Sequence, residues 1–214
     1  MNTYPGAPGT KRPIRTLTDD EQTKFFAAMK LAGPDWYVAA HLMGTLGLRV
    51  GEVRKLNWRN VRLTDAEASE IDLTPDVAKA RAARKLPLPT WLALILHTHK
   101  ARALENYDVQ QTKAGLVVTF AGFADEPVIT KRNHTRPGIR YLQIVVGKVA
   151  QASIGHRINC HMLRHTFATN LLKNTNTRVV QTALGHRSLQ STQIYTHPSM
   201  ADLREAVTKT SPEP

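Results

Sequence analysis

The chain has a single cysteine, Cys160, among its 214 residues, so it can form no internal disulfide. It has no apolar run close to the roughly 20 residues that a membrane-spanning helix requires, and its first residues lack the apolar centre of a secretory signal. These absences argue against a disulfide-stapled secreted domain and against an integral membrane protein. We therefore expect a cytoplasmic protein, in which Cys160 is a small buried residue rather than a nucleophile.

Acidic residues are missing from a long part of the chain. Between Pro127 and Ala201 there is no aspartate or glutamate, although this stretch contains ten lysines and arginines. The whole chain has a formal net charge of +12 and a pI near 10.1. This balance favours a polyanionic partner, and charge alone does not distinguish nucleic acid from an acidic membrane surface. A solvated basic surface without a partner is the alternative interpretation.

The two ends of the chain differ from its middle in composition. Residues 1–14 and 209–214 are rich in proline, glycine, threonine and serine, which predicts flexible tails. Residues 15–208 are enough to bury one good core, so we expect a single domain over this range.

Hydrophobic spacing predicts helices on both sides of a short region of strands. Thr18, followed by acidic residues as far as Glu21, has the form of a capping box at a helix start. Residues 61–90 alternate in polarity and predict a small antiparallel sheet. Further helices are predicted over residues 35–48, 50–58, 91–104 and 138–152, with a short extended run at 116–120 and a basic loop over 122–137. This order predicts an α+β domain dominated by helix.

His41 and Tyr141, in two of these helices, have simple structural interpretations, and a glycine is expected to direct Arg49. His41 lies in an apolar helix and is expected to be a core or surface histidine rather than a ligand. Tyr141 is expected to face inward in its helix. Gly47 interrupts the helical pattern just before Arg49, which lets the chain turn and direct the guanidinium into a cleft. Glu52 is expected to brace this loop or a neighbouring arginine.

The stretch from His161 to Tyr195 contains the most chemistry-bearing residues. His161 and Arg164 are three residues apart at helical spacing, so both can share one face near a helix start. A second helix is predicted from a cap at Thr177 to Gly185, which places His186 just past its end. Two imidazoles, a guanidinium and a phenol without a carboxylate suit an anionic phosphodiester that is attacked by the phenol.

Three ordered blocks carry a resemblance to a known family. They read TLGLRVGEVRKLNW (45–58), HMLRHTFAT (161–169) and ALGHRSLQSTQIYTH (183–197). In this order the chain resembles the tyrosine recombinases, the family of phage integrases, Xer-type resolvases and fimbrial invertases. The resemblance spans most of the chain, from about residue 15 to 205. It implies the mainly helical catalytic-domain fold of the family, with a small antiparallel sheet, and assigns Arg49 to the family's first-arginine box.

The resemblance also implies an activity, site-specific recombination of double-stranded DNA. Tyr195 would form a 3′-phosphotyrosine and release a 5′-hydroxyl, which preserves the bond energy for resealing. Donors from Arg49, Arg164 and His186 would hold the phosphate, and His161 would assist as acid or base. No metal and no nucleotide cofactor are needed for this reaction.

A lysine between two strands acts as the general acid in the family, and its counterpart here is Lys79. The flanking residues depart from the pattern, because Ala78 and Ala80 stand where glycine or threonine is usual. Lys85, or less plausibly Lys55, is therefore an alternative, and a basic loop that contacts DNA only through its charge is another.

A zinc hydrolase is a competing interpretation. His161 and His165 are separated by four residues and could join His186 or His197 around a metal. The glutamate of a metalloprotease HExxH motif is absent, and no other carboxylate lies in residues 127–201. We therefore expect no metal, and His165 is expected to support the site or to pack.

The expected partners are double-stranded DNA and other copies of the chain. A C-terminal helix around Leu203 can pack on its own domain or dock into a neighbouring protomer on DNA. About 15 residues precede the first predicted helix, too few for the N-terminal domain with which most family members clamp DNA. A natural minimal recombinase, an excised catalytic fragment or a decayed relic would each fit. A type IB topoisomerase-like activity and a basic regulator that binds DNA without cleaving it are the alternative functions.

Overall fold

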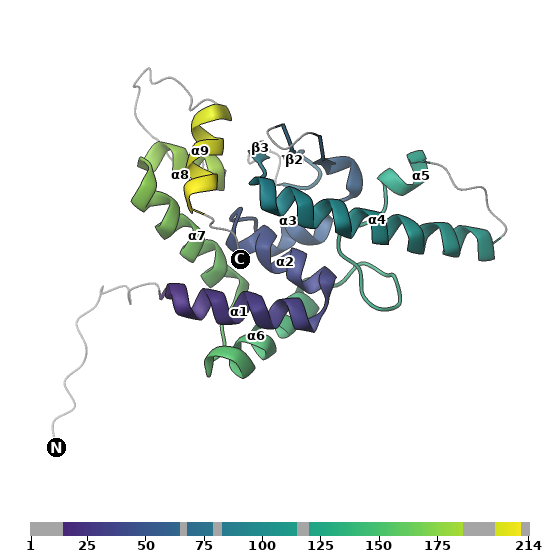
Figure 1. Cartoon of the computed structure of the whole chain (residues 1–214), viewed down its shortest axis with the longest axis horizontal. Helices are drawn as coiled ribbons and strands as arrows, with labels where there is room; N and C mark the ends of the chain where they lie inside the picture. Colours follow the sequence, from purple (N-terminus) through teal and green to yellow (C-terminus); the bar gives the residue numbers. More distant parts are fainter. Residues whose placement is uncertain (1–14, 65–67, 79–82, 115–119, 186–199, 211–214) are drawn as a thin grey trace.

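The computed structural model describes residues 15–64, 68–78, 83–114, 120–185 and 200–210 (Figure 1). The elements in chain order are α1 (Asp19–Ala32), α2 (Pro34–Gly44), α3 (Val50–Lys55), the 3-10 turn η1 (Trp58–Asn60), β1 (Val61–Arg62), β2 (Glu70–Leu73), β3 (Arg84–Pro87), α4 (Thr90–Lys113), α5 (Phe120–Ala124), α6 (Ile139–Ile154), α7 (Cys160–Asn174), α8 (Thr177–Leu184) and α9 (Met200–Thr210). The predicted α+β class, with helices before and after one small sheet, is confirmed.

Helix α1 begins with the predicted capping box. The Thr18 hydroxyl accepts a hydrogen bond from the Glu21 amide at 3.2 Å, and the Glu21 carboxylate accepts one from the Thr18 amide at 2.9 Å. Phe25 and Met29, one turn apart, are buried and face the core. Through this face α1 packs against α2 and α6.

Helix α2 is the centre of the core. It contacts α1, α3, α4, α6 and α7, and every residue from Tyr37 to Met43 is buried. His41 is one of them, as predicted for a core histidine, and its ring stacks on Phe26 with centroids 4.2 Å apart. The helix ends at Gly44, earlier than the predicted residue 48, because the chain turns through Gly47 at a φ of +67°.

The sheet is antiparallel, with the strand order β1-β2-β3. In its register Ile71 pairs with Leu86, and Asp72 pairs with Lys85. Ile71, Leu73 and Leu86 are buried, so one face of the sheet closes the core. The prediction of a small antiparallel sheet in residues 61–90 is confirmed.

Three further details of the prediction are wrong. Helix α4 runs to Lys113, well past the predicted residue 104, and α5 occupies part of the predicted basic loop. Tyr141 is 44% exposed rather than inward-facing. It lies against Trp36 of α2, with ring centroids 5.4 Å apart, so its apolar surface is covered by an aromatic neighbour outside the core. The run 116–120 lies outside the described residues except for Phe120, which begins α5.

The last helix, α9, packs on its own domain. It contacts α7, α8 and β3, and it buries Leu203, Ala206 and Val207 there. Figure 1 shows it beside α8 at one end of the molecule. Of the two arrangements expected for this helix, the structure has the intramolecular one. None of the described helices combines the length and the apolar character that a transmembrane segment needs.

Candidate active site

One pocket brings together the predicted site residues that the structure describes. Arg49, His161 and Arg164 line a cavity of about 330 Å³, here called the site pocket. Its walls come from α3, the beginning of α7 and Gln143 of α6. The other three predicted residues, Lys79, His186 and Tyr195, lie outside the described residues. A larger cavity, of about 620 Å³, is lined by residues of α2, α4 and the loop before α6 and by none of these three described site residues.

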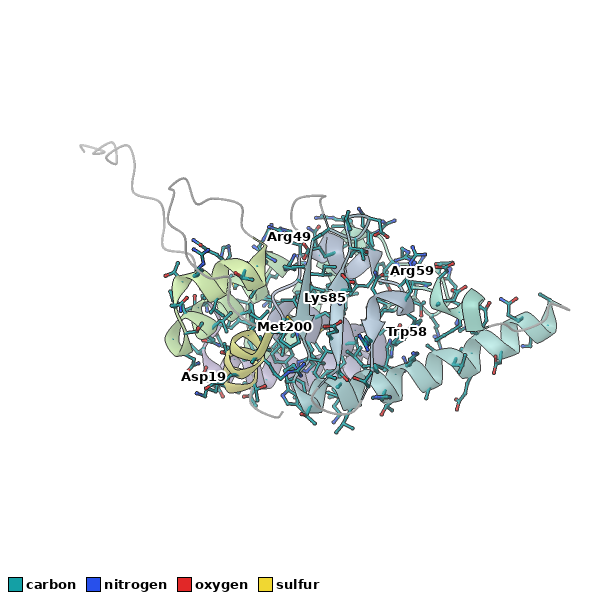
Figure 2. All side chains as sticks on the ribbon, turned by 90° about the horizontal axis from the view of Figure 1, so that it is seen from above. Asp19, Arg49, Trp58, Arg59, Lys85 and Met200 are labelled. Atoms are coloured by element: carbon teal, nitrogen blue, oxygen red, sulfur yellow. The ribbon has the colours of Figure 1, made fainter. Side chains whose placement is uncertain are left out.

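Arg49 is placed by the turn between α2 and α3. Gly47 adopts a left-handed conformation, and Arg49 follows in an extended conformation as the residue that precedes α3. Its amide donates to the Glu52 carboxylate at 2.8 Å, and its Nη1 donates to the same carboxylate at 2.9 Å. The side chain is still 37% exposed, so it can reach a bound anion while it is held from one side. Figure 2 shows Arg49 at the upper edge of the molecule.

Arg164 is buried in the second turn of α7, with 5% of the residue exposed. Its Nη1 donates to the Gly47 carbonyl, and its Nη2 donates to the Leu184 carbonyl at 2.7 Å. Burial lowers the pKa of Arg164 to about 10, which leaves the guanidinium charged at neutral pH. This residue therefore links the turn before Arg49 to the end of α8.

Helix α8 ends two residues before His186. Its N-cap is Asn176, one residue before the predicted Thr177, and the Asn176 side chain accepts from the amides of Arg178 and Val179. Its C-terminal cap is Gly185 in the left-handed conformation, as predicted, with φ 61° and ψ 43°. The end of this helix therefore fixes the point from which His186 follows.

His161 lies in the first turn of α7 and is exposed toward the site pocket. The helix is capped by Asn159, whose side chain accepts from the Met162 amide at 2.9 Å. His165 lies beside His161, with ring centroids 6.2 Å apart, and its pKa is lowered by burial and by the neighbouring His161 and Arg164. The described residues contain no group of three or more histidines, cysteines or carboxylates that could hold a metal ion.

Cys160 also lines the site pocket but is not activated. It is buried, and burial raises the pKa of its thiol to about 11. The thiolate is therefore almost absent at neutral pH. The prediction of a small buried residue is confirmed.

Of the three candidate lysines, the structure describes Lys55 and Lys85, and these two lie in different surroundings. Lys55 lines the site pocket, where its Nζ donates to the Asp76 carbonyl at 2.9 Å. Lys85 lies on β3 and forms an ion pair with Glu70 at 2.9 Å, and this hydrogen bond raises its pKa, which makes it a weaker proton donor. Lys85 does not line the site pocket. Figure 2 labels it apart from Arg49.

Arg84 was not among the site residues predicted from the sequence. Its side chain is only 6% exposed, and its two Nη atoms donate to the two Glu52 oxygens at 3.2 Å each. Its Nε donates to the Ala183 carbonyl at 2.6 Å. A signal existed in the alternation of the strand, because Arg84 shares the inward-facing register of Leu86 and Leu88.

Glu52 is thus surrounded by three guanidinium groups, those of Arg49, Arg84 and Arg164, the last at 3.9 Å. We call these four residues the Glu52 cluster. Burial by itself raises the pKa of Glu52, but the hydrogen bonds and charge of Arg84, with the bonds from Arg49, more than offset it and hold the pKa below its ordinary value. Three positive charges against one negative charge leave the cluster at +2, which suits an anion. The prediction that Glu52 braces the loop or an arginine is confirmed.

A family model described as "Phage integrase family" matches residues 15–202. The chain belongs to the phage integrase family. Among its relatives, the tyrosine recombinase XerC of Oceanobacillus iheyensis is 33% identical over 214 aligned residues, which cover 96% of this chain and 64% of that protein. The chain spans less than two thirds of the curated XerC relatives that it matches, and 46% of the one from Pseudomonas syringae pv. tomato.

Solved structures of recombinases share the fold. The XerA recombinase superposes with a TM-score of 0.65 at 24% identity, over 93% of this chain and 66% of XerA. The XerH recombinase, solved bound to its difH substrate in a pre-cleavage complex, gives 0.60 at 20% identity, over 83% of this chain and 48% of XerH. The expected tyrosine recombinase catalytic-domain fold is confirmed.

Proposed function

We propose that this chain is the catalytic domain of a site-specific DNA recombinase, which cuts and rejoins DNA strands through a 3′-phosphotyrosine on Tyr195. The observation that carries the proposal is the site pocket, in which His161, Arg49 and Arg164 line one cavity. Membership of the phage integrase family supports the same activity.

Phosphate binding follows from the charge of the pocket. Arg49 keeps an accessible planar fork that can contact two phosphate oxygens at once, and Arg164 adds a second charge from the buried side. His186, two residues past the end of α8, is the third donor of the proposal. These donors stabilise the charge that grows on the phosphate oxygens in the transition state.

The cleavage step needs an activated phenol. A tyrosine hydroxyl has an ordinary pKa near 10, so a cationic pocket that favours the developing phenolate promotes its attack. In this step a bond forms between Tyr195 Oη and phosphorus while the bond from phosphorus to O5′ breaks. The phenolic proton passes to a base, with His161 assisting, and Lys79 protonates the O5′ leaving group. The reverse reaction, with a 5′-hydroxyl from another strand, reseals the DNA.

Double-stranded DNA in the cytoplasm is the proposed substrate. The acid-free stretch from Pro127 to Ala201 contains Gln143 of α6 and the beginning of α7, which line part of the site pocket. Recombination joins two duplexes, so more than one copy of the chain must act together. If α9 mediates that self-association, it must first leave its contacts with α7, α8 and β3.

The test is whether the protein becomes covalently attached to nicked DNA duplexes. Cleavage close to the nick releases a short fragment that diffuses away, so the cut strand cannot be resealed and the protein stays attached. The purified chain is incubated with such duplexes, drawn from the DNA that flanks its own gene, and the products are separated on a denaturing gel. We expect a protein–DNA adduct that is absent in Tyr195→Phe. DNA that is bound but yields no adduct would favour a basic regulator that does not cleave. Relaxation of supercoiled plasmids that lack paired sites would favour the topoisomerase-like alternative.

A further inference from the structure

We propose that Arg84 is a positioning residue for strand cleavage, which holds Arg49 and the end of α8 in one fixed arrangement. The proposal rests on the proposed function for its effect on cleavage, and on the contacts of Arg84 for its effect on geometry. Arg84 is the first residue of β3, and through its three donor nitrogens it joins that strand to Glu52 of α3 and to Ala183 of α8.

The first half of the arrangement runs through Glu52. Both oxygens of this carboxylate accept from Arg84, and the same oxygens accept from the amide and the guanidinium of Arg49. Glu52 is 4% exposed, so water cannot replace a lost donor without a rearrangement. Without Arg84, burial would raise the pKa of Glu52 and weaken its hold on Arg49. Arg49 would then lose the contact that sets the direction of its fork.

The second half of the arrangement is the end of α8. The last carbonyl groups of a helix have no partners within the helix. Here Arg84 donates to the Ala183 carbonyl at 2.6 Å, and Arg164 donates to the neighbouring Leu184 carbonyl at 2.7 Å. Two arginines of the Glu52 cluster thus hold the last turn of α8, and the chain continues from it through Gly185 to His186. A displacement of this turn would move the starting point of His186 relative to Arg49.

The planar guanidinium is essential to this role. Its fork contacts both carboxylate oxygens of Glu52, while its Nε points at a different helix. A lysine has one nitrogen and can satisfy only part of this set. Arg84→Lys therefore keeps the charge and loses the link between the two helices, whereas Arg84→Gln loses both.

A purely structural ion pair and a positioning residue give different kinetics. If Arg84 only stabilises the fold, its loss lowers the fraction of folded protein, so the final amount of adduct falls while the rate constant of each folded molecule is unchanged. If Arg84 positions the site, the rate constant falls and the final amount is retained. A misplacement of about 1 Å in a catalytic group can cost about 100-fold in rate.

The kinetic arm measures single-turnover adduct formation by the full chain on the nicked duplex. We expect Arg84→Gln to lower the rate constant about 100-fold and Arg84→Lys about 10-fold, with DNA affinity within about threefold of the wild type. Met29→Ala, which removes a buried side chain of α1 far from the cluster in sequence, serves as the stability control and should reduce the amount of adduct only. Arg102→Gln, which breaks the 3.0 Å ion pair with Asp35, serves as the ion-pair control and should leave the rate constant unchanged.

The second experiment is amide hydrogen exchange without DNA, which reports directly on whether Arg49 and the end of α8 are held in place. Arg84→Gln should speed exchange at the Arg49 amide, which donates to Glu52, and at Gly185 in the cap of α8. Exchange in α1 should not change. Unchanged exchange at both sites, or a wild-type rate constant in Arg84→Gln, would overturn the inference. A wild type that binds DNA and forms no adduct would instead refute the proposed function, and the exchange arm would still decide whether Arg84 orders the pocket.

Discussion

At the scale of single residues, Glu52 holds together groups that would otherwise repel one another. Three guanidinium groups lie around its buried carboxylate, and each benefits from the same negative charge. The removal of one partner from a buried ion pair is far more costly than its net contribution suggests, because the remaining charges stay buried without compensation.

Glu52→Gln should therefore destabilise the fold by about 3 kcal/mol at pH 7, although glutamine has the same shape. The folded-state pKa of Glu52 is lowered, so its stabilising contribution is complete above its unfolded value of about 4.5 and is lost as the pH falls through the folded value. Urea unfolding at pH 7 and at a series of decreasing pH values below 4.5 measures both effects. A loss that is as large below the folded pKa as at pH 7 would show that the charge of Glu52 is not the cause.

His41 gives the molecule a second sensitivity to acid. Burial lowers its pKa from 6.5 to about 3, so the imidazole is neutral in the folded state at any pH above that. The unfolded chain binds a proton near pH 6.5 and the folded chain does not, so stability is full above pH 6.5 and falls below it by about 1.4 kcal/mol per pH unit.

His41→Leu should remove the part of the acid destabilisation that His41 causes. The unfolding free energy of this variant should therefore fall less steeply than that of the wild type between pH 6.5 and pH 4.5. Thermal or urea unfolding across this range is the measurement. His134→Gln, at an exposed position in the loop before α6, is the matched control and should keep the wild-type slope. Equal slopes in His41→Leu and the wild type would refute the assignment.

At the scale of elements, the turn between α2 and α3 decides where Arg49 lies. Gly47 has a φ of +67°, and a Cβ atom there would lie 2.3 Å from Cδ1 of Phe167. The Gly47 carbonyl also accepts from Arg164, so this turn is joined to α7 twice, by packing and by a hydrogen bond.

Gly47→Ala should destabilise the fold by about 2 kcal/mol or more, because the backbone conformation is strained for alanine and Phe167 must move. It should also slow cleavage, because Arg49 and Arg164 both depend on the turn. Gly51→Ala is the stability control: its Cβ would lie 3.9 Å from Ile139, within the helix α3, where alanine is at least as good as glycine. If the two variants unfold at the same urea concentration, the strain argument fails.

Much of this arrangement can be predicted from residues that are close together in the sequence. The capping box of Thr18, the left-handed turn at Gly47 and the left-handed cap at Gly185 depend on neighbouring residues, so local pattern predicts them. The prediction that Glu52 supports an arginine used only the spacing within one helical turn. Tyr141 was misplaced because its helix pattern does not reveal Trp36, which lies more than 100 residues earlier and covers its ring.

The role of Arg84 could not be predicted in the same way. Its alternation with Leu86 and Leu88 indicates an inward position, but its partner Ala183 is 99 residues away. A backbone carbonyl carries no side-chain signal in the sequence, and only the packing of β3 beside α8 brings the two groups together. The site residues Lys79, His186 and Tyr195 lie outside the described residues and stay predictions.

At the scale of the whole molecule, charge should govern the proposed encounter with DNA. The net charge of +12 is concentrated around an acid-free stretch, so binding should weaken linearly in log Kd with log salt concentration. Arg140, exposed in the first turn of α6, lies three residues before Gln143, which lines the site pocket. The two therefore share a face of the helix.

Arg140→Ala should weaken DNA binding and reduce the slope of log Kd against log salt by about one, the value expected for the loss of one phosphate contact. Fluorescence anisotropy over a series of salt concentrations is the measurement. Lys24→Ala, on α1, removes a cation that is already paired with Asp20 at 2.7 Å and should leave the slope unchanged. Equal slopes for Arg140→Ala and the wild type would show that this face does not meet the phosphates.

The Glu52 cluster also imposes an order on how the molecule is built. Arg164 reaches back 117 residues to the Gly47 carbonyl, and Arg84 reaches forward 99 residues to Ala183. During synthesis on a ribosome, Arg49 and Glu52 emerge long before α7 and α8 exist. The pocket therefore cannot be complete until the last quarter of the chain has been made and has folded back, and a prematurely ended chain carries its first arginine without a finished site.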